Sequence, residues 1–358
     1  MTLCAQCQSV PTPLSNDGTL ILVGLDPEQI EALTSCVEVY GIVPTSVGEG
    51  MLSVSLFDGC FQIVLDWSRL VSERLVAEGR YLLLERGEEL GLSHLAKVRP
   101  LSDLLKSLKN AWVLEMIREN RLVSYYHPIV NAGEPDVIHA HECLMRGVAE
   151  DGKIVSPGQV LDAADEEGLM FHLDRACRIN AIKGFAGENV AGKAFINFNP
   201  VSVYNPVACL QSTVAAARSV GLRPERVVFE LIERNHVADE AHLLRIVDFY
   251  RAAGYGVALD DVGAGYSGLN LLSSLKPDYI KLDMHLIRDV DKDPVRQSIV
   301  GNMLEMARKL GILSVVEGVE TCEEYEFARA EGADFVQGYL FAKPAPRAVE
   351  ADLPLLAA

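Results

Sequence analysis

The sequence has no apolar run long enough to cross a membrane, and it has no excess of basic residues. A membrane-spanning helix needs roughly 20 apolar residues in a row, and no stretch of the 358-residue chain approaches that length. The amino terminus, MTLCAQCQSV, lacks the basic and then apolar pattern of a secretory signal. We therefore expect a cytoplasmic protein with no membrane partner.

The charge balance excludes another class of function. The chain has 32 Lys and Arg against 50 Asp and Glu, which gives a net charge of −18. Non-specific nucleic-acid binding needs a basic surface, so we expect no nucleic-acid partner. An anionic substrate is still compatible with this charge if bound cations offset the repulsion between substrate and protein.

The sequence also lacks a repeated pattern of metal-ligating cysteines. Six of the eight cysteines are scattered without a framework, as expected for reduced thiols in the cytoplasm. The other two, Cys4 and Cys7, form a single CxxC with no second CxxC or HxxxH near it. Turn-forming residues follow, so a flexible amino-terminal segment over 1–17 is favoured over a zinc or redox site.

Residues 18–90 have the pattern of a small α/β module. Strands are expected at TLILVGL (19–25), MLSVSL (51–56), FQIVLDW (61–67) and RYLLLER (80–86), with a helix over 27–41. FQIVLDW invites comparison with a phosphate-accepting receiver domain, but too little chain separates Asp66 from Lys97 for the missing strand and helix pairs. Asp66 is thus expected to be an ordinary strand-end residue. A helical connector over 91–119 follows, and a regulatory role for the module rests on its position alone.

Short apolar strands alternate with amphipathic helices over 120–358. The strands are expected at 124–130, 138–146, 194–199, 227–232, 257–261, 278–283, 313–317 and 335–341. Several helices between them end in glycine. Eight strands with intervening helices predict a TIM-like (β/α)8 barrel. Only the short connection NAGEPDV joins the first two strands, so we expect these two to pair antiparallel.

Polar residues gather near the carboxyl ends of these strands, where the active sites of such barrels lie. Each has an ordinary explanation alone, since a strand-end Glu is usually solvated and a Lys in a strand usually extends to solvent. The carboxylates and amides among them are hard oxygen donors, with no His or Cys in the set, which suits Mg²⁺ or Mn²⁺ better than Zn²⁺. The set is Glu142 with Arg146, Asn197, Glu230 with Glu233, Asp260 with Asp261, Lys281, Glu317 with Glu320, and Gln337.

The adjacent carboxylates in GVALDDVGAGYSGL, Asp260 and Asp261, need a particular backbone. Neighbouring strand residues point to opposite faces, so both can reach one site only if the strand breaks there. Two cations about 3.5–4 Å apart would then share Asp260, lower the pKa of a bound water and hold a phosphoryl oxygen. Lys281 and Glu317 would position or deprotonate that water, and Arg146 would grip a phosphate. This arrangement predicts phosphodiester hydrolysis.

The same residues resemble the EAL-type cyclic di-GMP phosphodiesterase family over roughly residues 120 to 345. The motifs YYHPIV, ECLMR, FINFNP, FELIE, DDVGAGYSGLNLL, DYIKLD, VVEGVE and QGYLFAKP occur in the family's order. The resemblance implies a bacterial signal-transduction enzyme that opens the second messenger cyclic di-GMP to linear pGpG. It also implies two Mg²⁺ or Mn²⁺ ions, inhibition by Ca²⁺, and a homodimer formed through the loop after the fifth strand.

The resemblance further implies roles for individual residues. The metal ligands would be Glu142, Asn197, Glu230, Asp260, Asp261 and Glu317, the last directly or through water. The catalytic residues would be Glu142, Glu317 and Lys281, with Lys281 ordering the attacking water. The substrate-contacting residues would be Arg146, Gln337 and Glu320. Glu233 would brace the loop after the fifth strand.

Several positions depart from the usual pattern of this family. Cys143 stands for alanine in the signature tripeptide, Gly147 for tryptophan, and Val262 and Ala264 alter the loop after the fifth strand. These changes bear on rate and regulation more than on chemistry. His127 stands where glutamine is usual, and it either contacts substrate or packs at the first strand.

Two other functions stay open from the sequence. A barrel that binds cyclic di-GMP or docks a partner without turnover would keep the same residues. A Schiff-base aldolase would use Lys281 on the sixth strand, but the surrounding carboxylates would hold that lysine charged and disfavour this chemistry.

Overall fold

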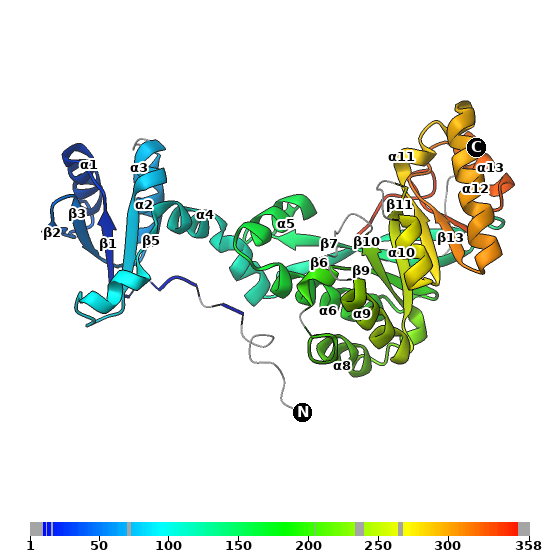
Figure 1. Cartoon of the computed structure of the whole chain (residues 1–358), viewed down its shortest axis with the longest axis horizontal. Helices are drawn as coiled ribbons and strands as arrows, with labels where there is room; N and C mark the ends of the chain where they lie inside the picture. The colour runs from blue at the N-terminus through cyan, green and yellow to red at the C-terminus, as the bar shows by residue number, and fades with distance from the viewer. Residues whose placement is uncertain are drawn as a thin grey trace. The chain divides into compact units, whose positions relative to one another are not determined.

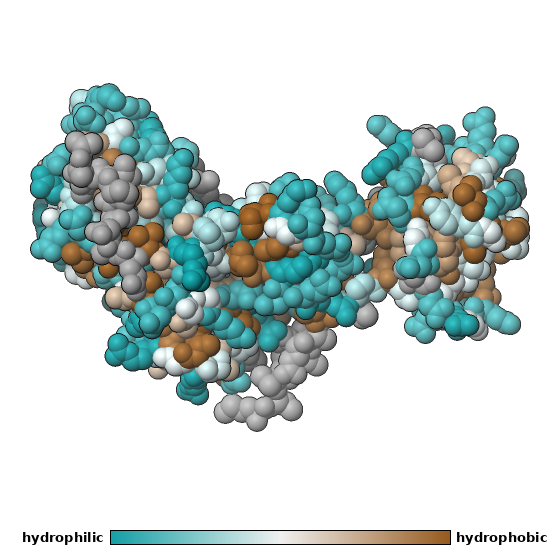
Figure 2. Space-filling view, turned by 180° about the vertical axis from the view of Figure 1, so that it is seen from behind, coloured by the Kyte–Doolittle hydropathy of each residue, from teal (hydrophilic) through white to brown (hydrophobic). Residues whose placement is uncertain are grey.

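The computed structural model describes residues 10–349 with gaps at 12, 16, 70–72, 204, 233–239 and 264–267. Its contacts divide the chain into two units. One consists of Val10–Glu119 with Leu161–Leu169, and the other of Asn120–Val160 and the chain from Met170 onward. None of the described helices is both long and apolar enough to cross a lipid bilayer. Hydrophilic residues cover most of the face shown in Figure 2, and apolar residues show in patches on both units.

The N-terminal unit is an antiparallel sheet packed against helices. The strand order is β2-β3-β1-β4-β5, and every neighbouring pair is antiparallel. The strands are β1 (Thr19–Val23), β2 (Thr45–Gly48), β3 (Met51–Ser55), β4 (Arg80–Leu84) and β5 (Arg99–Pro100). The helices are α1 (Pro27–Glu38), α2 (Cys60–Ser68), α3 (Glu73–Glu78), η2 (Leu92–Lys97) and α4 (Leu101–Arg118). Helix α4 contributes Leu101 and Leu104 to the core of this unit.

The strand expected at FQIVLDW is wrong, because these residues belong to helix α2. The buried residues of α2 follow the helical spacing i, i+3, i+4, i+7; they are Cys60, Ile63, Val64 and Trp67. A short continuous apolar run does not distinguish such a buried helix from a buried strand. Asp66 accordingly lies on the helix surface with its side chain 56% exposed, and not at a strand end.

The second unit is a closed barrel of eight strands, as predicted (Figure 1). The ring runs β6-β14-β13-β12-β11-β10-β9-β7, and pairing of β6 with β7 closes it. Strand β6 is antiparallel to both of its neighbours, so the predicted antiparallel first strand is confirmed. The strands are β6 (Leu122–Asn131), β7 (Ile138–Val148), β8 (Ile154–Val155, paired outside the ring with β7), β9 (Lys193–Phe198), β10 (Val227–Ile232), β11 (Gly256–Val262), β12 (Tyr279–Leu282), β13 (Leu313–Val316) and β14 (Phe335–Val336).

Helices lie on the outside of these strands (Figure 1). They are α6 (Met170–Glu188), η3 (Pro200–Ser202), α7 (Pro206–Cys209), α8 (Gln211–Ser219), η4 (Pro224–Arg226), α9 (Glu240–Ala252), α10 (Gly268–Leu275), α11 (Met284–Ile287), η5 (Val290–Lys292), α12 (Pro294–Leu310) and α13 (Cys322–Ala330). Helix α5 (Pro157–Glu166) follows β8, and its residues from Leu161 onward belong to the N-terminal unit. Glycine ends α12 as predicted, since Gly311 has the left-handed φ of 70°. Helices α6, α9 and α12 pack against β9, β11 and β13.

The last strand is shorter than the predicted 335–341. Only Phe335–Val336 forms β14, and the chain then bends past the loop that follows β13. The approach is so close that a Cβ on Gly338 would lie 2.0 Å from the Val319 carbonyl oxygen. Glycine permits this contact, and the contact ends the strand.

The side chains that point into the barrel form two layers. The lower layer is an apolar cluster with one residue from each strand of the ring: Ile129, Ala140, Phe195, Val228, Ala258, Tyr279, Val315 and Phe335. Side chains alternate along a strand, so the next inward position lies two residues further toward the carboxyl end. In the parallel strands those positions are Glu142, Asn197, Glu230, Asp260, Lys281, Glu317 and Gln337. The antiparallel β6 reaches the same layer two residues earlier, at His127.

Candidate active site

Lys281 lies at the centre of the polar layer. It is on β12 and only 1% exposed. Its Nζ lies 2.7 Å from Glu230 Oε1, 2.7 Å from Glu317 Oε1, 3.2 Å from Asp260 Oδ1 and 3.7 Å from Glu142 Oε2. One buried ammonium group therefore balances part of the charge of four carboxylates.

Burial and the proximity of these charges shift their pKa values. Burial alone would lower the pKa of Lys281, but Asp260, Glu142, Glu230 and Glu317 outweigh it and hold that pKa well above its usual value. Burial, assisted by neighbouring carboxylates, raises the pKa of Glu230 and of Glu317 well above the usual range, and it raises the pKa of Asp260. For Glu142 the burial effect is overcome by Lys281 and nearby hydrogen-bond donors, so its pKa is lowered.

Two side-chain amides hold Glu142. Asn197 Nδ2 donates a hydrogen bond of 3.1 Å to Glu142 Oε1, and Gln337 Nε2 donates one of 3.0 Å to Oε2. Because the Asn197 nitrogen is engaged, its carbonyl oxygen is the atom left to coordinate a cation. Gln337 is 2% exposed and fixes the orientation of the Glu142 carboxylate.

A β-bulge in β11 brings the two adjacent aspartates to one site. The register with β12 shifts between Leu259 and Val262, and Asp261 adopts a left-handed φ of 56°. The Asp261 N–H donates a hydrogen bond of 2.9 Å to Asp260 Oδ1. The break that the sequence required is therefore present, and it lies inside the strand.

The carboxylates form two groups that share Asp260. Glu142, Glu230 and Asp260 each offer an oxygen within 4.8 Å of the others, and so do Asp260, Asp261 and Glu317. Both Glu230 oxygens are buried; Oε1 lies 2.7 Å from Lys281 Nζ, and Oε2 has no hydrogen-bond donor among the described residues. A buried carboxylate oxygen without a donor fits a divalent cation, and a donor set made of oxygen alone suits Mg²⁺ or Mn²⁺.

The remaining predicted residues lie outside this cluster. Arg146, near the end of β7, is partly exposed, and its guanidinium lies 5.1 Å from the Tyr125 ring centroid. Glu320 is exposed on the loop after β13 and accepts a hydrogen bond of 2.7 Å from Arg288. Glu233 lies outside the described residues. Arg288, the donor to Glu320, is a positively charged side chain near this face of the barrel that the sequence analysis did not identify.

His127 belongs to the polar layer, a position that the sequence left undecided. It faces Glu142 in the β6–β7 register, and its Nε2 lies 3.0 Å from the Ala342 carbonyl oxygen. Burial lowers the pKa of His127, and the charge of Glu142 opposes this shift. The signal that identifies its place is the direction of β6: in an antiparallel strand, the residue two before Ile129 reaches this layer.

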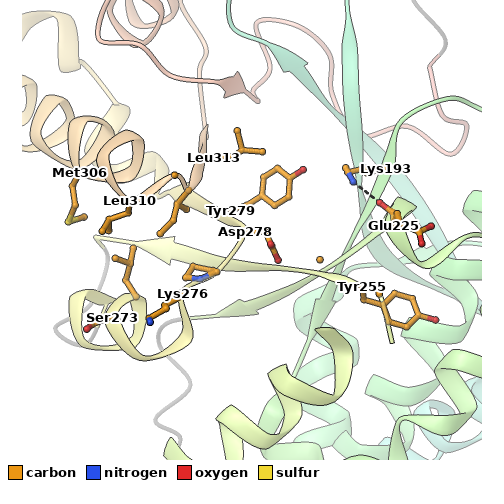
Figure 3. A pocket seen from close by; sticks show the side chains of 16 residues that line it. Lys193, Glu225, Tyr255, Ser273, Lys276, Asp278, Tyr279, Met306, Leu310 and Leu313 are labelled. Carbon is orange, nitrogen blue, oxygen red and sulfur yellow. Dashed lines mark hydrogen bonds between the residues drawn. The ribbon is translucent and has the colours of Figure 1, made fainter. Parts of the chain in front are cut away.

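A separate hollow lies at the opposite end of the strands (Figure 3). It has a volume of about 940 Å³ and is lined by residues around the starts of β9 to β13. Lys193 Nζ donates a hydrogen bond of 2.6 Å to the Glu225 carbonyl oxygen on one side of it, and Met306, Leu310 and Leu313 lie on the other. Residues of the acidic cluster do not line this hollow, so the two features are distinct.

The chain resembles known proteins over the barrel. The EAL domain family matches residues 110–344. PdeG of Escherichia coli (strain K12), described as a probable cyclic di-GMP phosphodiesterase, is 32% identical over 237 residues, which are 64% of this chain and 45% of PdeG. The structure of a standalone versatile EAL protein from Vibrio cholerae O395, in its c-di-GMP-bound form, is 34% identical. It covers 66% of this chain and 98% of its own, with a TM-score of 0.59.

A third likeness extends beyond the barrel. The structure of Klebsiella pneumoniae BlrP1 covers 92% of this chain and 96% of its own at 21% identity, with a TM-score of 0.57. At this identity the likeness shows the fold alone. The chain spans less than half of PdeG, so the activity of that whole protein does not transfer directly. The family match, however, covers well over half of the chain and includes every residue of the acidic cluster. The chain therefore belongs to the EAL domain family.

Proposed function

We propose that the barrel hydrolyses cyclic di-GMP to linear pGpG with the help of two divalent cations, Mg²⁺ or Mn²⁺. The observation that carries this proposal is the pair of oxygen-ligand groups that share Asp260 and enclose Lys281. The choice of nucleotide is supported by the description of PdeG and by the nucleotide bound to the Vibrio cholerae protein.

The residues divide naturally between two cations. Glu142, Glu230 and Asp260, with the Asn197 carbonyl, would hold one. Asp260, Asp261 and Glu317 would hold the other. Bound at these positions, the cations supply a water of lowered pKa and an electrophile for a phosphoryl oxygen. Ca²⁺, with longer bonds and a higher coordination number, is expected to bind without supporting turnover.

Lys281 acts as a hydrogen-bond donor in this scheme. Its raised pKa keeps it protonated at neutral pH, so it orients the attacking water and cannot serve as a base or as a Schiff-base nucleophile. Glu317, whose side chain is 17% exposed, is more accessible than the fully buried Glu230 and is placed to accept the proton of that water. The water oxygen adds to phosphorus as the bond to the 3′ oxygen breaks. The 3′ oxygen takes up a proton to become a hydroxyl, and the phosphate stays on the 5′ oxygen as in pGpG.

The test is direct. Purified protein is incubated with cyclic di-GMP and Mg²⁺ or Mn²⁺, and the nucleotides are separated by chromatography. We expect pGpG from the wild type and none from Glu230→Gln. The matched control is Glu305→Gln, which changes a surface carboxylate on α12 that pairs with Lys309, and it should retain activity. Nucleotide binding without product in the wild type would identify a receptor, and product from Glu230→Gln would contradict the assigned ligands.

Three further predictions accompany this function. The division near residue 120 would separate a regulatory N-terminal unit from the catalytic barrel, in line with the two units of the fold. The chain would form a homodimer through the loop after β11, of which residues 264–267 lie outside the described part of the chain; light scattering of the purified protein can test for the dimer. A cytoplasmic location completes the proposal and can be tested by cell fractionation.

A further inference from the structure

A buried ion pair lies outside the acidic cluster, on helix α6. Arg178 is fully buried, and its guanidinium pairs with Asp174, one turn earlier on the same helix. Arg178 Nε also donates a hydrogen bond of 3.3 Å to Thr213 Oγ1 on α8. The chemistry proposed above uses none of these groups.

The Asp174–Arg178 ion pair contacts the two residues that directly follow Asn197. Asp174 Oδ1 accepts a hydrogen bond of 2.9 Å from the backbone N–H of Asn199, the first residue beyond β9. The Arg178 guanidinium lies 5.0 Å from the ring centroid of Phe198, the last residue of β9. The ion pair therefore contacts both residues that follow Asn197: Arg178 packs on the ring of Phe198, and Asp174 accepts the backbone N–H of Asn199.

We propose that Asp174 is a positioning residue for Asn197, and through Asn197 for the first cation site; this inference rests on the proposed function. The Asn199 N–H marks the point where the chain leaves the barrel and turns into η3, since Asn199 Oδ1 accepts the Val201 N–H at 3.1 Å. A hydrogen bond to a charged acceptor is stronger than one to a neutral acceptor, so Asp174 fixes the direction in which the chain leaves β9. The bond of 3.1 Å from Asn197 to Glu142 depends on that direction.

Stability alone does not account for this ion pair. Compared with apolar side chains of similar size, a buried ion pair is often neutral or even destabilising, because both charges lose their hydration. Removal of one partner is costly, since it leaves the other charge buried and unpaired. Variants that replace both partners at once therefore separate the positioning role from the stability of the fold.

Two double variants differ at a single group. Asp174→Leu/Arg178→Met removes both charges and the oxygen that accepts the Asn199 N–H. Asp174→Asn/Arg178→Met removes the same charges but keeps an oxygen in that place. Leu and Asn have similar shapes, so the comparison isolates the acceptor. The readout is Mn²⁺ binding to nucleotide-free protein by calorimetry, with thermal unfolding as a measure of the fold.

We expect the Leu variant to bind Mn²⁺ on the order of tenfold more weakly than the Asn variant, at similar unfolding temperatures. The Asn variant should stay within a few-fold of the wild type. Equal Mn²⁺ affinity in the two folded variants would overturn the proposal.

Should the Leu variant fail to fold, Asp174→Glu provides the test. It keeps both charges and moves the acceptor by one methylene, so an unchanged Mn²⁺ affinity would count equally against the proposal. Because the measurement needs no nucleotide, a difference between the variants supports the positioning role even if the protein hydrolyses nothing. A wild type that binds no Mn²⁺ would overturn both proposals.

Discussion

Lys281→Met removes the cation at the centre of the acidic cluster and keeps nearly the same side-chain length. Two carboxylate oxygens lie 2.7 Å from Nζ, a third lies at 3.2 Å and a fourth at 3.7 Å. Removal of one partner of a buried ion pair costs about 3–5 kcal/mol, because the other charge stays uncompensated. We therefore expect the metal-free variant to lose about 3–5 kcal/mol of unfolding free energy at neutral pH, measured by urea denaturation.

Mg²⁺ distinguishes the two roles that we assign to Lys281. Cations bound to the same carboxylates replace the missing positive charge, so Mg²⁺ should stabilise Lys281→Met by more than it stabilises the wild type. Cations do not replace the hydrogen-bond donor that orients the water. Turnover of cyclic di-GMP should therefore stay lower than wild type by a factor on the order of 100 or more at saturating Mg²⁺.

The control for this experiment is Lys309→Met on the surface of α12. Lys309 lies 2.8 Å from Glu305, but both side chains are exposed to solvent, where an ion pair contributes little. This variant should match the wild type in stability, in its response to Mg²⁺ and in activity. If Lys281→Met were as stable as the wild type without metal, or if Mg²⁺ stabilised both equally, Lys281 would not be the counter-charge of the cluster.

Three other measurements test the electrostatics and the packing. The folded-state pKa values of Glu230 and Glu317 are raised, so these groups reduce the stability of the metal-free protein as pH rises above their usual 4.5. The increase in Tm on addition of Mg²⁺ should therefore grow between about pH 5 and about pH 8, and a constant increase would contradict this. Burial lowers the pKa of His141 from 6.5 to about 4, so its contribution to stability is complete above pH 6.5 and is lost as pH falls toward 4. His141→Gln should flatten the Tm profile over that range, and an unchanged profile would refute the assignment. Trp67→Ala should cost about 3–5 kcal/mol in chemical unfolding because Trp67 fills the core of the N-terminal unit. Mn²⁺ binding by the barrel serves as its control and should not change.

The barrel was predictable because its strands are short apolar runs between amphipathic helices. The errors arose where local pattern and tertiary packing disagree. Residues 61–67 have the pattern of a strand, but they form helix α2, whose buried residues, Trp67 among them, share a core with residues of β1 and β3. The predicted strand at 335–341 is too long because apolar residues continue past Gly338. At Gly338 a close contact with the loop after β13 bends the chain.

The polar layer was predictable for a different reason. Each polar residue of a parallel strand lies two positions after an apolar residue of the barrel interior, so alternation along the strand places both on one face. His127 needed the further knowledge that β6 runs the other way. The partners of Asp174 and Glu320 could not be read from the sequence, since they lie 25 and 32 positions away on other elements.

The charge balance of the polar layer is itself an argument for cations. The two ligand groups together hold five carboxylates, and four of them lie within 3.7 Å of the Lys281 ammonium. Burial makes their ionised forms costly, which is why the pKa values of Glu230 and Glu317 lie well above their usual range. A divalent cation reverses this cost, because it pairs with the ionised oxygens and displaces their protons. Metal binding should therefore release protons, and calorimetry in buffers of different ionisation enthalpy would detect them.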